Sequence, residues 1–369
     1  MEPFIPDILP IDIDWAAHVS LIGKANAALA RYDGMLQGIV NPDVFLSPLT
    51  TQEAVLSSMI EGTIASMEEV LEYEANPRDH VEASKHEDIK EIINYRMAMW
   101  KAIESLETRP LCLNLVKDLH AILLDSMRGR NKAPGQFRRT QNYIASPGQP
   151  IEQATFVPPA PDQLAPTLDN WEKYLHFDEK DGLVQLAIVK AQFEIIHPFL
   201  DGNGRLGRML VPLFLFAKKL LSRPMFYLSA YLEANRDAYI TRLQAISQQK
   251  DWKGWIQFFL TAIIEQAAIN IENVRGMLHL YESMKDKVVE VTHSQFAIQA
   301  LDAIFSRLIF QAVDFPTFAR IPTKVTAASI IRQLQNAGIL KVLRPASGRR
   351  SAILVFPELI NLLEGKPVV

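Results

Sequence analysis

Residues 197–208 of the chain read His-Pro-Phe-Leu-Asp-Gly-Asn-Gly-Arg-Leu-Gly-Arg. The histidine ends an apolar run, residues 183–196, that has the composition of a helix, and Pro198 prevents this helix from continuing. The glycines that follow permit unusual backbone angles, so the chain can turn and aim successive N–H groups at one anion. A second helical run, residues 205–221, starts directly after them. The stretch therefore predicts two helices joined by a tight polar loop.

The polar groups of this loop suit a polyphosphate and its metal ion. Arg205 and Arg208 lie three residues apart at a helix start, where cations oppose the helix dipole, and they therefore indicate a bound anion. Asp201 offers a hard oxygen ligand for Mg²⁺, and the backbone of Gly202–Gly204 can cradle phosphate. His197 can take a proton from an attacking hydroxyl. Together these groups favour a group transfer from a nucleotide.

This pattern, His-Pro-Phe-x-Asp-Gly-Asn-Gly-Arg-x-Gly-Arg, resembles the active-site motif of the Fic family of protein adenylyltransferases. The resemblance implies that AMP is moved from ATP, with Mg²⁺, to a Ser, Thr or Tyr hydroxyl of a target protein or of the chain itself. It makes His197 the catalytic base and Asp201 the metal ligand. The implied nucleotide-binding residues of the motif are Gly202, Asn203, Gly204, Arg205, Leu206, Gly207 and Arg208.

A second motif lies upstream, at Ser57-x-x-x-Glu61-Gly62. Glu61 is expected at the end of a short helix that begins with a capping box at residues 50–53 and stops at Gly62. A carboxylate at that end of a helix needs a cationic partner unless water solvates it. The motif resembles the inhibitory motif of Fic proteins with an N-terminal inhibitory helix. The resemblance implies that Glu61 pairs with Arg208 and keeps the activity low.

Residues 135–161 combine glycines, prolines and β-favouring residues, with a turn at Pro147-Gly148, and so predict a β-hairpin. By the resemblance, this hairpin is a flap that docks the target backbone as an added strand. A hairpin that only covers the core is the alternative. The docking residues expected on the flap are Thr155, Phe156 and Val157.

The helical stretch 227–245 resembles the Fic helix that lines the adenine and ribose pocket. Asn235 could bond a base edge and Tyr239 could stack on the base, which makes both candidate nucleotide-binding residues. Tyrosines at helical spacing also occur in protein cores, so a purely structural role stays open.

Length and composition indicate a large helical protein. The chain has 369 residues, of which 49% are hydrophobic and 22% are charged, as in ordinary globular proteins. Helical periodicity dominates until two helices and a β-hairpin near the end, which resemble a winged helix domain. We therefore expect a mostly α fold in three parts. These are an N-terminal helical region with the inhibitory helix (1–110), a Fic catalytic core with the flap (111–280) and a winged helix domain (281–369).

Composition also bounds the partners and the location. A net charge of -4 argues against nucleic-acid binding over the whole surface. Because the expected winged helix domain holds few basic residues, a role in protein binding or dimer positioning is favoured over DNA contact. The resemblance implies a homodimer. The single cysteine, Cys112, excludes an intrachain disulfide and favours the cytoplasm. Neither a signal peptide nor a membrane segment is expected.

Other functions stay open beside autoinhibited AMP transfer. The same site could remove AMP or transfer another nucleotide-linked group. A function of a different class is a DNA-binding regulator whose core senses a nucleotide without turning it over.

Overall fold

The structure is a computed structural model that describes residues 2–39, 41–77, 82–145 and 149–367. The chain forms two compact units. The first comprises Met1–Gln37, Leu56–Thr63 and Ile93–Ala268, and the second comprises Gly38–Val55, Ile64–Ile92 and Ile269–Val369. The division falls inside three helices, which are α2 (Pro42–Ile60), α4 (Ala83–Leu106) and α11 (Trp252–Thr292). Among the described residues, no helix has the length and apolarity that a membrane span requires.

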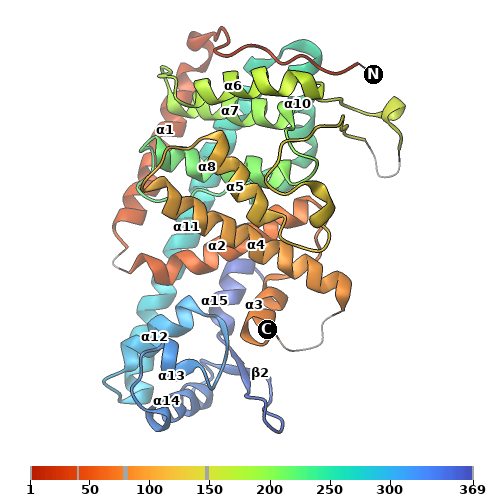
Figure 1. Cartoon of the computed structure of the whole chain (residues 1–369). Helices are drawn as coiled ribbons and strands as arrows, with labels where there is room; N and C mark the ends of the chain where they lie inside the picture. Colours follow the sequence, from red (N-terminus) through yellow and green to blue (C-terminus); the bar gives the residue numbers. More distant parts are fainter. Residues whose placement is uncertain (1, 40, 78–81, 146–148, 368–369) are drawn as a thin grey trace. The chain divides into compact units, whose positions relative to one another are not determined.

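The first unit is helical and is built around α7 (Gly182–Ile196), whose side chains are almost all buried. A helix that is apolar on every side must be covered on every side. The helices that pack on it include α1 (Trp15–Gln37), α6 (Leu164–Leu175), α8 (Asn203–Ala217) and α10 (Arg236–Gln249), as Figure 1 shows. The same unit contains α5 (Leu113–Leu123), α9 (Ser229–Ala234) and the 3-10 helices η1 (Arg130–Lys132), η2 (Ile151–Gln153) and η3 (Pro161–Gln163).

The two helices predicted around residues 197–208 are present. α7 ends at Ile196 and α8 begins at Asn203, so residues 197–202 form the loop between them. Pro212 lies inside α8, and the helix ends at Ala217 rather than at the predicted Leu221.

The second unit contains a three-stranded antiparallel sheet in the order β1-β3-β2. The two predicted helices and the hairpin correspond to α12 (Ala297–Ser306), α14 (Lys324–Asn336), β2 (Lys341–Arg344) and β3 (Ile353–Val355). The sequence did not indicate β1 (Ile309–Gln311), which pairs with β3. The unit also contains α3 (Met67–Ala75), α13 (Phe315–Phe318) and α15 (Pro357–Glu364). The assignment of residues 281–369 as a winged helix domain stays a prediction.

The predicted start of α2 is wrong. The helix begins at Pro42 and not at a capping box, and it runs through Pro48, so Thr50 lies in its interior. Proline is well suited to the first position of a helix, because its missing N–H would have no partner there. Val44, Phe45 and Leu49 are buried, and this packing carries the helix past the backbone bond that Pro48 removes.

The predicted hairpin at residues 135–161 is reduced, in its described part, to one antiparallel bridge between Ile144 and Phe156. Its predicted turn at Pro147-Gly148 lies outside the described residues. Pro150 and the pair Pro158-Pro159 lack N–H groups and cannot extend a ladder of hydrogen bonds. We call residues 139–145 and 149–158 the flap.

Candidate functional site

The loop after α7 is fixed by its own backbone and by one amide. His197 takes a left-handed conformation with φ 48° and caps α7 through its N–H, which donates to the Phe193 carbonyl over 3.0 Å. Gly202, with φ 79°, precedes α8, and at this angle glycine is favoured over any other residue. Asn203 accepts the Phe199 N–H and donates to the Phe199 carbonyl, each over 2.9 Å. The Asn203 side chain therefore closes the loop.

A hydrogen bond fixes the tautomer of His197. Its Nδ1 lies 3.3 Å from the Glu194 carbonyl oxygen, which can only accept, so Nδ1 carries the proton and Nε2 is the basic nitrogen. Burial lowers the pKa of His197, so the imidazole is neutral near pH 7. The Arg138 guanidinium is buried and donates to the His197 carbonyl over 2.9 Å. Arg138 therefore holds the backbone at His197.

Arg208 is held by the end of α2. Its Nε donates to the Ser57 hydroxyl over 2.8 Å, and its terminal nitrogen donates to the Ser57 carbonyl over 2.8 Å and to the Glu61 carboxylate over 2.6 Å. Arg208 is 3% exposed and Glu61 is 39% exposed. Burial alone would raise the pKa of Glu61, but Arg208, and more weakly Arg205 and His197, hold it below its ordinary value. The predicted pairing of Glu61 with Arg208 is thus present in the structure.

Because Gly204 has no side chain, the Glu61 carboxylate can lie against Arg208. A Cβ atom there would lie 2.2 Å from the Glu61 carboxylate oxygen and 3.1 Å from the Arg208 guanidinium. A side chain at position 204 would therefore displace whatever anion Arg208 binds.

Asp201 lies at the open side of the loop. Its side chain is 45% exposed, and one carboxylate oxygen accepts the Gly202 N–H over 2.6 Å and faces Arg205 at 3.5 Å. Behind it, His120 on α5 accepts the Gly135 N–H at Nδ1 (2.8 Å), so its Nε2 donates to the Asp201 carbonyl (3.0 Å). Burial lowers the pKa of His120 to about 4, and the neutral ring therefore fixes the loop backbone.

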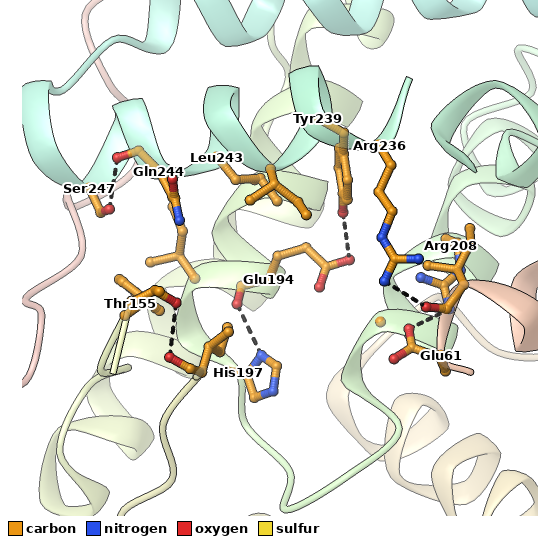
Figure 2. Close-up of a pocket in the computed structure, with 16 residues that line it drawn as sticks. Glu61, Thr155, Glu194, His197, Arg208, Arg236, Tyr239, Leu243, Gln244 and Ser247 are labelled. Atoms are coloured by element: carbon orange, nitrogen blue, oxygen red, sulfur yellow. Dashed lines mark hydrogen bonds and ion pairs between the residues drawn. The ribbon is translucent and has the colours of Figure 1, made fainter. Parts of the chain in front are cut away.

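A cavity of about 330 Å³ lies above the loop, within the size range of ligand pockets. Figure 2 shows its two ends: Glu61, Arg208 and Arg236 gather at one, and Leu243, Gln244 and Ser247 on α10 face Thr155 of the flap at the other. His197 and Glu194 lie between them. The complete lining is Ile60, Glu61, Ile144, Thr155, Phe156, Glu194, Ile195, His197, Gly204, Arg208, Arg236, Tyr239, Ile240, Leu243, Gln244 and Ser247.

A buried ion pair supports the floor of the cavity. The Lys190 ammonium, which is fully buried, donates to the Glu194 carboxylate over 2.9 Å and to the Tyr239 hydroxyl over 3.0 Å. Although burial alone would lower it, the pKa of Lys190 is raised by Glu194 and Tyr239. The ammonium joins α7 to α10 at the place where both helices line the cavity.

The predicted site residues divide into two groups. Those that line the cavity are Glu61, Thr155, Phe156, His197, Gly204, Arg208 and Tyr239. Those that do not line it are Ser57, Gly62, Val157, Asp201, Gly202, Asn203, Arg205, Leu206, Gly207 and Asn235. Several of the second group have structural positions: Val157 and Leu206 are 1% exposed, and the Asn235 amide donates to the Tyr231 carbonyl over 3.0 Å.

Two family models match the chain. The Fic/DOC family N-terminal model matches residues 19–104, and the Fic/DOC family model matches residues 110–215. The chain belongs to the Fic family.

Among the curated proteins, this Fic chain is 28% identical over 198 residues to a probable protein adenylyltransferase of Aquifex aeolicus, covering 53% of the chain and 56% of the relative. It is 30% identical over 205 residues to the protein adenylyltransferase Fic of Drosophila grimshawi, covering 52% and 36%. The matches thus span about half, or less, of these relatives' own length. A solved Fic family protein from Desulfovibrio desulfuricans G20 has the same fold, with a TM-score of 0.60 at 20% identity over 96% of this chain and 98% of that one.

The sequence predicted that residues 227–245 line the nucleotide pocket, but it assigned no individual role to Glu194, Arg236, Leu243, Gln244 or Ser247. One signal was available for Leu243 and Ser247, because they follow Tyr239 at intervals of four and therefore share its helix face. Glu194 had no comparable signal, because a glutamate near the end of an apolar helix is ordinarily a solvated residue.

Proposed function

We propose that this Fic protein transfers AMP from ATP to a hydroxyl side chain of a protein, and that Glu61 inhibits the transfer. The observation that carries the proposal is the place of the Glu61 carboxylate. It is bound to the buried Arg208 guanidinium in the same cavity as the neutral base His197. An arginine that donates to a carboxylate in this geometry can donate to a phosphate oxygen instead.

The two ends of the cavity differ in a way that supports one orientation of ATP. The triphosphate belongs at the end with Arg208 and Gly204, beside the start of α8, where N–H groups without intrahelical partners favour anions. The base belongs at the end formed by Thr155 and the C-terminal half of α10, where Leu243 offers apolar surface and Gln244 offers an amide. The relatives named as protein adenylyltransferases support AMP as the group transferred.

Asp201 would hold Mg²⁺ together with phosphate oxygens. Its carboxylate is partly exposed at the open side of the loop, and among the described residues no group of three or more His, Cys, Asp or Glu side chains could hold a metal. A single carboxylate completed by phosphate oxygens and water is a usual Mg²⁺ site. The bound ion would neutralise phosphate charge.

The chemistry follows from His197. Its Nε2 takes the proton of the target hydroxyl as the hydroxyl oxygen attacks the α-phosphorus. The new bond joins that oxygen to phosphorus, and the bond to the bridging oxygen of pyrophosphate breaks. Arg208 would bind the β- or γ-phosphate once Glu61 leaves it. With Glu61 in place, carboxylate and phosphate compete for one guanidinium, and the triphosphate cannot take the pose required for transfer.

The test uses ATP labelled either at the α- or at the γ-phosphorus, with Mg²⁺ and the purified chain. We expect the Glu61→Gly variant to become labelled from α-labelled ATP only, and the Glu61→Gly, His197→Ala double variant to remain unlabelled. Labelling from γ-labelled ATP would show a different transferred group. If Glu61→Gly is not labelled, and a chain that already carries AMP loses it, AMP removal is favoured as the function.

A further inference from the structure

Residues 7–9 are anchored to the core of the first unit. The Asp7 carbonyl accepts the Gln192 amide over 2.7 Å, and the Asp7 carboxylate accepts the Trp252 indole N–H over 2.9 Å. Leu9 exchanges two hydrogen bonds of 2.8 Å with the Asn170 amide. Gln192 lies on α7, five residues before His197. Residues 7–9 are therefore fixed to the helix that carries the base.

From this anchor the chain reaches the flap. The Phe4 N–H donates to the Val157 carbonyl over 2.9 Å, and the Phe4 ring lies 5.7 Å from the Phe156 ring. Phe156 in turn lines the cavity. The side chain of the neighbouring Ile5 is 83% exposed, so Phe4 and not Ile5 packs against the flap. Figure 1 shows this segment, in red, running to the N-terminus on the side of the flap.

Hydrogen bonds join the two described parts of the flap. At the bridge of Ile144 and Phe156, the Ile144 N–H donates to the Phe156 carbonyl over 2.8 Å. Beside the bridge, the Gln141 amide donates to the Pro158 carbonyl over 3.0 Å and the Tyr143 hydroxyl donates to the Gln149 carbonyl over 3.2 Å. The Thr155 and Phe156 N–H groups both donate to the Ile144 carbonyl, whereas the Val157 carbonyl accepts the Phe4 N–H. The segment 155–157 is therefore bonded to Ile144 through its first two residues and to the N-terminal segment through Val157.

We propose that residues 2–9 are a positioning arm for target docking, in which Phe4 holds Phe156 over the cavity and occupies the Val157 carbonyl. With this carbonyl taken, an extended target backbone has the Ile144 side of the flap for pairing. Tyr143 and Ile144, which are 42% and 41% exposed, provide apolar contact on that side. The proposal rests on the proposed transfer reaction. Phe4 is a positioning residue, because it acts through Phe156 and not on the nucleotide.

Hydrogen exchange of the full chain without nucleotide tests the arm independently of any activity. We expect Phe4→Ala to speed exchange at the Ile144, Thr155 and Phe156 amides, which bond across the bridge, and Phe4→Tyr to restore the slow exchange. The control is Ile5→Ala, which changes an exposed side chain of the same segment. Exchange at these amides that is equal in Phe4→Ala, Ile5→Ala and the unmodified chain would overturn the arm.

Kinetics test its role in docking. The enzyme is the Glu61→Gly chain, and the protein acceptor is a second copy with His197→Ala. We expect Phe4→Ala in the enzyme to raise KM for the acceptor several-fold and to leave KM for ATP unchanged. In Ile5→Ala and Phe4→Tyr, both KM values should equal those of the parent enzyme. An equal rise in KM for ATP would contradict a docking role. If no enzyme variant labels the acceptor, the proposed transfer fails, and hydrogen exchange alone decides whether the arm braces the flap.

Discussion

The Arg236 guanidinium lies 3.2 Å from the carbonyl oxygen of Ile60, the last residue of α2. Carbonyl groups at the end of a helix lack intrahelical partners and carry the negative end of its dipole. Arg208 holds the same segment from the other side through Ser57 and Glu61. Two arginines from two helices, α8 and α10, therefore keep the end of α2 in the cavity.

This second contact predicts that Arg236→Ala weakens inhibition. One charge-assisted hydrogen bond at a half-exposed site contributes about 0.5–1 kcal/mol, so basal self-labelling should rise roughly two- to fivefold. The rise should vanish in the Glu61→Gly background, where the segment no longer inhibits. Arg242→Ala is the matched control, because Arg242 lies on the same helix and is 47% exposed, against 51% for Arg236. A fall in labelling in both backgrounds would instead identify Arg236 as a phosphate ligand.

The pairing of Glu61 with Arg208 also predicts a pH dependence of stability. Because the folded-state pKa of Glu61 is lowered from its ordinary value of 4.5, the ionised carboxylate stabilises the fold fully above that value, and the stabilisation is lost as pH falls through the lower folded-state pKa. The melting temperature of the unmodified chain should therefore exceed that of Glu61→Gln by a constant amount between pH 6 and 8. Below about pH 4.5 the two should converge. A difference that changes near neutral pH would mean that another group controls the segment.

His197 predicts a pH profile for the transfer. Its pKa is lowered, and the reaction needs the neutral imidazole, so the rate should rise with pH through a value below the ordinary 6.5 and stay level from pH 7 to 8. Single-turnover labelling of the Glu61→Gly chain would measure this without interference from inhibition. His197→Asn should lower the rate by about two to four orders of magnitude, as expected when a general base is removed. It should leave the ATP-induced rise in melting temperature in place, and loss of that rise would show a binding role instead.

Local sequence signals predicted the loop at residues 197–202. The start of α2 and the position of α10 depend on tertiary packing, which these local signals do not contain. His197, Gly202 and the two flanking helices follow from one contiguous stretch in which proline and glycine fix the backbone. The start of α2 was mispredicted, because buried Val44 and Phe45 outweigh the local signal of the capping box. α10 lies beside the loop because it packs on α7. About forty residues separate the end of α7 from the start of α10, so no local sequence pattern indicates this contact.

The buried Lys190 supplies the last prediction, which concerns stability rather than activity. Its ammonium is 0% exposed and neutralises Glu194, which is 11% exposed, so Lys190→Met leaves a carboxylate uncompensated in a largely buried place. Breaking such a pair from one side costs about 3–5 kcal/mol, and urea denaturation should show a loss of this size. The double variant Lys190→Met, Glu194→Gln removes both charges and should recover most of the loss, because the expensive species is the unpaired charge and not the missing pair. Equal losses in the single and double variants would show that Lys190 matters through its methylene packing and its bond to Tyr239 instead.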